Sequence, residues 1–290
     1  MRPNPALPAF FTVDVEEWYQ PAVMERYVPR ARWGNQPLRL QEGLHIISEL
    51  LDKHEVKATF FCLSDLPKTH HALLRSLSDK GHEIASHGHT HRSFTGLTSK
   101  EIREELMLSR SILEDITGKQ VQGFRAPNFS ITDETVDLLV ETGYRYDSSL
   151  FKVRLHRGYG RLDRYPVQPT PYMIHPELME FPLSVLPWGF WQIPWAGGAY
   201  FRHFPRSIFL AGVQELVRSG YYHFYIHPWE LDTTQPHPKH MRWIDRLRHF
   251  RNISRSGKMI ESMLSKHSFS SIGQHLEAVV TSPIGQFSVA

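Results

Sequence analysis

Two histidines four positions apart are the first residues whose type and spacing suggest a chemical function. His87 and His91 follow a short apolar run, and a turn with this spacing presents both imidazoles on one side, as in a two-histidine metal site. With 18 histidines in 290 residues, about one such pair arises by chance, so the spacing alone is a weak signal. A second pair, His223 and His227, lies on a predicted strand, where four residues span ~13 Å, too far to share a metal. His87 and His91 are therefore the candidate ligands.

Two acidic residues end the first apolar run of the chain. In Asp14-Val15-Glu16-Glu17, the alternation of a strand places Asp14 and Glu16 on one face and Val15 on the other. Neighbouring carboxylates repel each other unless a cation or a shared proton relieves the repulsion. The pattern indicates either a metal or acid–base site or a solvated acidic turn.

Three further predicted strands end in residues that can do chemistry, namely Arg125, Asp147 and His227. An arginine at a strand end can hold a carboxylate ionised and oriented, although a surface arginine is the alternative. A single histidine is more often structural than catalytic. Candidates at five successive strand ends are nevertheless much less expected by chance than any one of them.

The elements that must position these residues alternate between strand and helix. The predicted strands are Ala9–Val15, Ala58–Leu63, Glu83–Ser86, Val121–Arg125, Tyr144–Asp147 and Tyr221–Ile226. The predicted helices cover 38–54, a segment around 73–77, 98–118 with a capping box at Thr98 and Glu101, a segment around 136–140, and 208–218. This alternation predicts an α/β fold with a parallel sheet or barrel, in which sites form at the carboxyl ends of the strands.

The alternation fails between residues 151 and 205, where Pro, Trp, Tyr and Gly are frequent. We interpret this segment as strands and loops inserted over one face. Beyond Pro238 the chain is basic and mostly helical in pattern. The predicted domains are a barrel over 1–236, which includes the insertion 151–205, and a helical extension over 237–290 that packs on the barrel or trails from it.

Composition excludes several classes of protein. With 41% hydrophobic and 22% charged residues the chain can build a core, and a net charge of +3 gives no support to a nucleic-acid partner. Cys62 is the single cysteine, and no apolar run reaches the ~20 residues of a membrane span. The N-terminus does not read as a signal peptide, so the sequence predicts a cytoplasmic protein, at the inner membrane face if it acts on a membrane-bound precursor. A homo-oligomer is left open.

These motifs together resemble the NodB-type polysaccharide deacetylases, carbohydrate esterase family 4. The chain is most similar to the subgroup found with bacterial exosortase and exopolysaccharide loci, which shows Asp-Val-Glu near the N-terminus and His-Pro-Trp-Glu (HPWE) near the C-terminal end. The similarity runs from about Phe10 to Pro236 and includes the glycine-rich block Gly197–Arg202. The resemblance implies a distorted (β/α)7 barrel, the NodB homology fold, that binds one divalent metal ion, usually Zn2+.

The resemblance also implies a role for each residue. Asp14 matches the catalytic base, Arg125 the arginine that orients it, His227 the general acid and Asp147 the carboxylate that tethers this acid. His87 and His91 match the metal histidines. Val15 stands where the family has its metal carboxylate, so Glu16 becomes the expected ligand and Glu17 the less favoured alternative. The substrate-binding candidates are Asn128, through a backbone N–H in an oxyanion hole, together with Trp18, Trp229 and Arg202.

The expected function is that of a hydrolase in carbohydrate metabolism, a metal-dependent polysaccharide deacetylase. It would remove N-acetyl groups from N-acetylhexosamine residues of a bacterial exopolysaccharide or its precursor and release acetate, a step in exopolysaccharide biosynthesis. Alternatives on the same fold are an allantoinase-like or peptidoglycan deacetylase-like amidohydrolase and a non-catalytic carbohydrate-binding relative. An Fe(II) oxygenase is a further alternative, but the strand–helix alternation disfavours its usual β-sandwich.

Overall fold

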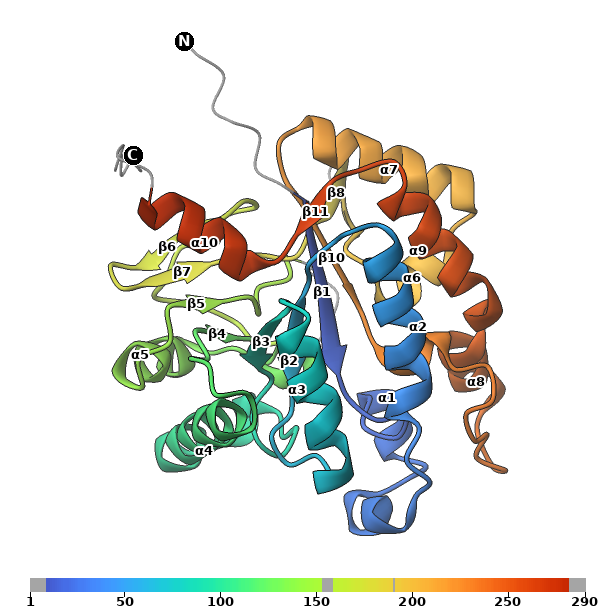
Figure 1. Cartoon of the computed structure of the whole chain (residues 1–290), viewed down its shortest axis with the longest axis horizontal. Coiled ribbons are helices and arrows are strands. Elements are labelled where there is room, and N and C mark those ends of the chain that lie inside the picture. The colour runs from blue at the N-terminus through green and yellow to red at the C-terminus, as the bar shows by residue number, and fades with distance from the viewer. Residues whose placement is uncertain (1–8, 153–158, 190, 282–290) are drawn as a thin grey trace.

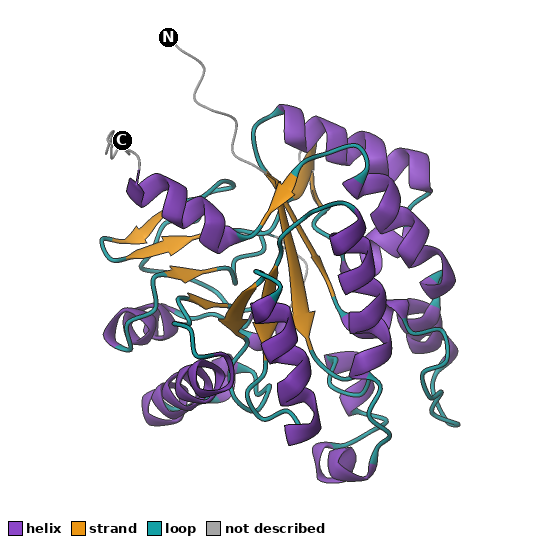
Figure 2. Cartoon of the chain, in the orientation of Figure 1, coloured by secondary structure: helices purple, strands orange, loops and turns teal. Residues whose placement is uncertain are grey.

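A curled, mostly parallel sheet forms the centre of the molecule (Figures 1 and 2). The computed structural model describes residues 9–152, 159–189 and 191–281. The strand order is β10-β1-β2-β3-β4-β5-β7-β6, and β11 also pairs with β1. The expected α/β class and NodB-like architecture are confirmed, with the sheet curled into a half-barrel. Within the described residues, no pairing joins β10 to β6.

The described residues form the following strands and α-helices, which alternate along the first half of the chain. The strands are β1 (Ala9–Val15), β2 (Thr59–Cys62), β3 (Glu83–Ser86), β4 (Gly123–Phe124), β5 (Tyr146–Asp147), β6 (Tyr172–His175), β7 (Leu178–Glu180), β8 (Val185–Trp188), β9 (Trp191–Pro194), β10 (Tyr222–Ile226) and β11 (Phe269–Ser270). The α-helices are α1 (Ala22–Glu25), α2 (Leu40–Lys53), α3 (His71–Asp79), α4 (Ser99–Thr117), α5 (Asp133–Glu141), α6 (Gly198–His203), α7 (Arg206–Arg218), α8 (Trp243–Phe250), α9 (Ser256–Leu264) and α10 (Ile272–Thr281).

The predicted elements of this half are confirmed closely because their signals are local. The apolar stripe of α2 is buried at Leu44, Ile47 and Leu51, as its 3.6-residue period requires. The capping box of α4 forms at Thr98, and its helix ends at Gly118 in the left-handed conformation. Because β1 to β5 and β10 run parallel, their carboxyl ends gather at one edge of the sheet.

The segment 151–205 differs from its prediction. Strand β7 pairs in parallel with β5, and β6 pairs antiparallel with β7, so this part of the segment continues the sheet. Only β8 and β9 form a separate two-stranded hairpin. The prediction that the whole segment lies over one face is therefore wrong for β6 and β7, whose short runs pair at the open edge. Residues 153–158 and 190 lie outside the described part of the chain.

The chain after Pro238 packs against the first strands and helices. Strand β11 pairs with β1 at Ala9 and Phe10, and α9 packs against α2. Figure 1 shows α9 beside α2, close to α8. Among the described residues, no helix has both the length and the apolar character to cross a membrane. The first eight residues of the N-terminal segment and the last nine of the extension are outside the described ranges.

Candidate active site

A cleft of about 350 Å³ opens at the carboxyl ends of the parallel strands. Its lining includes Asp14 and Glu16 from the end of β1, His87 and His91 after β3, and His227 after β10. The structure thus brings together candidates that are up to 213 positions apart in sequence. The parallel register makes this convergence a direct consequence of the fold.

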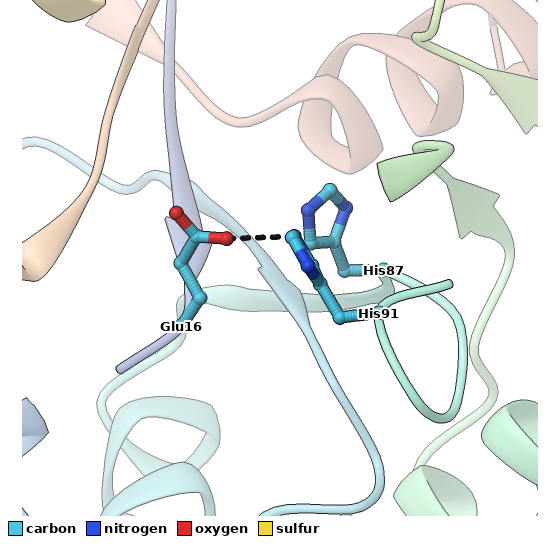
Figure 3. Close-up of side chains that lie close together, drawn as sticks. All are labelled: Glu16, His87 and His91. Carbon is cyan, nitrogen blue, oxygen red and sulfur yellow. Dashed lines mark ion pairs between the residues drawn. The ribbon is translucent and has the colours of Figure 1, made fainter. Parts of the chain in front are cut away.

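Glu16, His87 and His91 form the cluster that could hold a metal ion (Figure 3). Their ligand atoms lie within 4.8 Å of one another, and all three side chains are buried. The Oε2 atom of Glu16 is 2.8 Å from Nε2 of His91. The Nδ1 atom of His87 lies 2.8 Å from the carbonyl oxygen of Arg125. A carbonyl only accepts, so Nδ1 carries the proton and Nε2 keeps its lone pair for a ligand.

These three residues fit a divalent metal. One carboxylate oxygen and two imidazole nitrogens form a common donor set for zinc. In addition, Nδ1 of His91 is buried and has no hydrogen-bond partner within the described residues. Ring nitrogens of His54, His82 and His249 are in the same situation, so the donor set itself carries the fit.

The pKa shifts of Glu16 and His87 favour the deprotonated forms of these two residues. Burial alone would raise the pKa of Glu16, but the charges on His227 and His91 outweigh it and lower the pKa to about 2. Burial lowers the pKa of His87 to about 4, against the opposing effect of Asp14. Ionised carboxylate and neutral imidazole are the forms that bind metals.

A buried glutamate that the sequence analysis missed shapes the histidine loop. Glu105, on α4, accepts hydrogen bonds from the backbone N–H groups of His89 and Thr90, at 2.7 and 2.9 Å. The loop also uses left-handed conformations at Gly88 (φ 81°) and His91 (φ 59°). The non-glycine residue at positive φ is strained, as is common where a side chain must be aimed into a site. One feature of the sequence could have indicated this role. Glu105 lies on the buried side of α4, beside the apolar residues Ile102 and Leu106, where a carboxylate needs hydrogen-bond donors.

Asp14 is held by Arg125, as the arginine motif predicts. Nη1 of Arg125 lies 2.5 Å from Oδ1 of Asp14, and both side chains are buried. The remaining donors of the guanidinium bond Thr12, Ser148 and Nε2 of His223. A guanidinium whose donors are all paired in this way fixes the position and direction of the Asp14 carboxylate.

His227 faces the acidic residues from the other side of the cleft. Its Nε2 atom lies 3.5 Å from Oε1 of Glu16 and 3.9 Å from Oδ2 of Asp14. Burial would lower the pKa of His227, but Glu16, Glu230 and Asp14 together raise it to about 9. The imidazole is therefore protonated near neutral pH and can donate a proton into the cleft.

Two family models match this chain side by side. Residues 41–146 match "Polysaccharide deacetylase", and residues 148–277 match "Domain of unknown function (DUF3473)". Residues 41–146 are thus similar to the polysaccharide deacetylases. This matched region contains His87, His91 and Arg125, whereas His227 lies in the second matched region.

Relatives and solved structures agree with the deacetylase domain. A peptidoglycan deacetylase of Helicobacter pylori is 27% identical over 155 residues, 49% of this chain and 53% of that protein. The chain thus spans about half the length of this curated relative. The fold resembles that of a Mycobacterium smegmatis structure assigned to the polysaccharide deacetylases, with a TM-score of 0.64, 18% identity, and coverage of 100% and 97% of the two chains. It also resembles a pseudoenzyme of carbohydrate esterase family 4 from Bacillus anthracis, with a TM-score of 0.52, 18% identity, and coverage of 93% and 66%.

The predicted tether of the general acid is wrong in this member of the deacetylase fold. Asp147 bonds Oγ and N of Ser149 at 2.6 and 3.1 Å, and lies opposite Glu180 in the pairing of β5 with β7. Burial raises the pKa values of both Asp147 and Glu180. The carboxylate that contacts Nδ1 of His227, at 2.8 Å, is Glu230. Strand β7, which continues the sheet beside β5, places a second buried carboxyl group, Glu180, next to Asp147.

Glu17, the alternative ligand, points away from the cluster of Glu16, His87 and His91. Its carboxylate accepts hydrogen bonds from the backbone N–H groups of Arg39 and Leu40 at the start of α2. It also contacts Nε2 of His70 at 3.1 Å. The strand alternation that favours Glu16 thus agrees with the structure, and Glu17 serves the N-terminus of a helix.

The substrate-binding candidates separate into two groups. Asn128, Trp229 and Arg202 line the cleft. Trp18 does not: it is buried in a cluster with Tyr19 and Met24, and its Nε1 donates to the carbonyl of Pro37. The prediction that Trp18 contacts substrate is therefore wrong, because a core position outcompetes a surface stacking role.

Trp229 and Arg202 support the site from behind its surface. Nε1 of Trp229 donates to Oε1 of Glu16 at 3.1 Å. The guanidinium of Arg202 is buried and donates to Glu230 at 2.6 Å. Asn128 has a φ of 55° in the turn after β4, which orients the local backbone differently from a helix.

Proposed function

We propose that this protein is a metal-dependent deacetylase that removes N-acetyl groups from N-acetylhexosamine residues of a bacterial exopolysaccharide or its precursor. The observation that carries the proposal is the placement of a base and an acid beside one ligand cluster. Asp14 is paired with Arg125, and Nε2 of the protonated His227 lies 3.9 Å from Asp14 and 3.5 Å from Glu16, a member of the cluster. The proposal adds substrate and metal dependence to the deacetylase domain.

The chain's own groups account for the proton movements of amide hydrolysis. Asp14, held in place by its pair with Arg125, accepts the proton of the attacking water. A backbone N–H near Asn128 donates to the carbonyl oxygen as it becomes negative. His227 gives its Nε2 proton to the departing amine, and the products are acetate and a free amino sugar. A divalent ion held by Glu16, His87 and His91 would supply Lewis acidity that activates water and polarises the carbonyl.

The fold alone does not decide activity, since a pseudoenzyme shares it. The test is acetate release from N-acetylated oligosaccharides, from peptidoglycan and from allantoin, measured before and after chelation and with Zn2+ added back. We expect release from an N-acetylhexosamine oligosaccharide, loss on chelation and recovery with metal. Turnover of allantoin alone would favour the cyclic-amide alternative, and turnover of nothing would favour a non-catalytic binding protein. Comparing a lipid-linked precursor with finished polymer then identifies the natural form of the substrate.

A further inference from the structure

The short 3-10 turn after β10 holds a buried carboxylate directly behind the proposed acid. In this turn (Pro228–Leu231), Oε1 of Glu230 lies 2.8 Å from Nδ1 of His227 and accepts the backbone N–H of His227 at 3.2 Å. Glu230 is completely buried. Since an ionised carboxylate only accepts, the Nδ1 proton points at Glu230 and the Nε2 atom points into the cleft.

The other oxygen of Glu230 is fixed by an arginine from the glycine-rich segment. Nε of Arg202 lies 2.6 Å from Oε2 of Glu230, and both side chains are almost fully buried. Nη1 of Arg202 donates to the carbonyl oxygens of His249 and Arg251, at 2.9 and 2.8 Å. A buried ion pair adds little net stability, so its value here lies in fixed geometry.

The same turn also reaches the metal cluster. Trp229, next to Glu230, donates its indole N–H to Glu16 and stacks on the ring of His249 with centroids 4.2 Å apart. His249 in turn bonds Gln235 through Nε2 at 3.0 Å. One turn therefore orients both the acid and one ligand, and helix α8 supports it.

We propose that Glu230, held by Arg202, is the residue that positions His227 as proton donor, in place of the Asp147 that the family resemblance suggests. The inference rests on the proposed deacetylase function and assigns a task to the region that matches the domain of unknown function. That region contains His227, Glu230, Arg202 and the carbonyl groups that hold Arg202. This region therefore supplies the proposed proton donor and the residues that hold it in position.

The experiment compares two substrates that differ in their need for an acid. An N-acetylglucosamine oligosaccharide must have its amine protonated on departure, whereas 4-nitrophenyl acetate releases a stable phenolate without a proton. We expect Glu230→Gln to lower kcat on the amide about 10²-fold and to change kcat on the ester less than about threefold. Asp147→Asn should leave the ratio of the two activities unchanged, and Glu230→Asp should recover part of the amide rate.

Two measurements keep the outcome decisive. Removing the charge of Glu230 leaves the buried guanidinium of Arg202 without its ion-pair partner. The double variant Glu230→Gln/Arg202→Met is therefore measured beside the single variant. In parallel, NMR of the Zn2+-loaded protein labelled with 15N at histidine follows the His227 Nδ1–H proton, which should be lost in Glu230→Gln and kept in Asp147→Asn. Three results would overturn the proposal. They are an equal loss of kcat on both substrates in Glu230→Gln, loss of the Nδ1–H signal in Asp147→Asn, and an unprotonated Nδ1 of His227 in the wild type. If the wild type hydrolyses no amide, the deacetylase function fails, while NMR still decides the role of Glu230.

Discussion

The two sides of the cleft are built in different ways. On one side, Asp14, Glu16, His87, His91 and Arg125 follow directly from the ends of β1, β3 and β4. On the other side, His227 also follows a strand, but its geometry depends on contacts with residues far away in sequence. The first side is positioned mainly by the parallel pairing of its strands, and the second by a buried ion pair between separate segments.

For the residues that the family matches cover, this difference follows the boundary between the two matches: His87, His91 and Arg125 lie in the first, and His227 lies in the second. The polysaccharide deacetylase match ends at residue 146, before the segment that brings in β6 and β7. Strand β7 places Glu180 beside Asp147, and the turn after β10 places Glu230 beside His227.

The largest expected effect comes from removing a ligand on the first side. We expect His91→Ala to reduce bound Zn2+ from one ion per chain to nearly none. We also expect kcat on both amide and ester to fall about 10³-fold or more, because the metal contributes several kcal/mol. Metal content is measured by elemental analysis after dialysis. His89→Ala is the matched control, since His89 lies in the same loop and its ring contacts Ser64. Full metal content in His91→Ala would remove this residue from the site.

A smaller loss on both substrates is expected when the base is neutralised. Asp14→Asn keeps the size of the side chain but cannot accept the proton of water, so kcat should fall on the order of 10²–10³-fold on amide and ester alike. Metal content should remain, because Asp14 is not in the ligand cluster. This pattern separates the base from Glu230, whose loss should affect the amide only. Activity undiminished in Asp14→Asn would contradict the assignment of the base.

The sequence predicts the first side well because each of its signals is local. Alternation along β1 distinguishes Glu16 from Glu17, and the histidine spacing is read within a single loop. The positions of the first five strands follow from apolar runs and from glycines that end the helices. These signals need no knowledge of which segments meet in space.

The second side was not predictable from the same signals. Nothing local shows that β7 pairs with β5, since β5 and β7 have only two and three residues. Without that pairing, Asp147 would be as free to tether the acid as the family resemblance implies. Glu230 lies three residues after His227 in the His-Pro-Trp-Glu motif. Its orientation toward His227 depends on the ion pair with Arg202, and only the folded chain shows that Arg202 is buried beside it. The prediction that Trp18 contacts substrate failed because the sequence around an aromatic residue does not distinguish a core position from a sugar-binding cleft.

A third substitution should displace the turn of the second side while leaving His227, Glu230 and Arg202 unchanged. Gly43 lies in α2 against the turn that carries Glu230, and an added Cβ would meet the carbonyl oxygen of Pro228 at 1.9 Å. We expect Gly43→Ala to displace this turn, to lower the free energy of unfolding by about 1–3 kcal/mol and to reduce amide kcat about tenfold, with bound metal retained. Thermal unfolding and the amide-to-ester ratio provide the measurements. Gly257→Ala, in α9 with nothing within 4 Å of the added Cβ, is the control and should be neutral or stabilising. Equal behaviour of the two variants would show that the turn tolerates the shift.

The smallest expected effect tests the link between the two sides. Trp229→Phe keeps the aromatic ring that stacks on His249 but removes the N–H that donates to Glu16. Groups that orient a metal ligand typically affect metal affinity by 10–100-fold, and we expect about tenfold weaker Zn2+ binding here, with saturating metal restoring most of the activity. Trp18→Phe is the matched control, because it loses a hydrogen bond to Pro37 within the same aromatic cluster but does not reach Glu16. Competition with a chelator of known affinity measures the difference. If both variants bind Zn2+ like the wild type, the turn after β10 serves the acid alone, and the two sides of the cleft are independent.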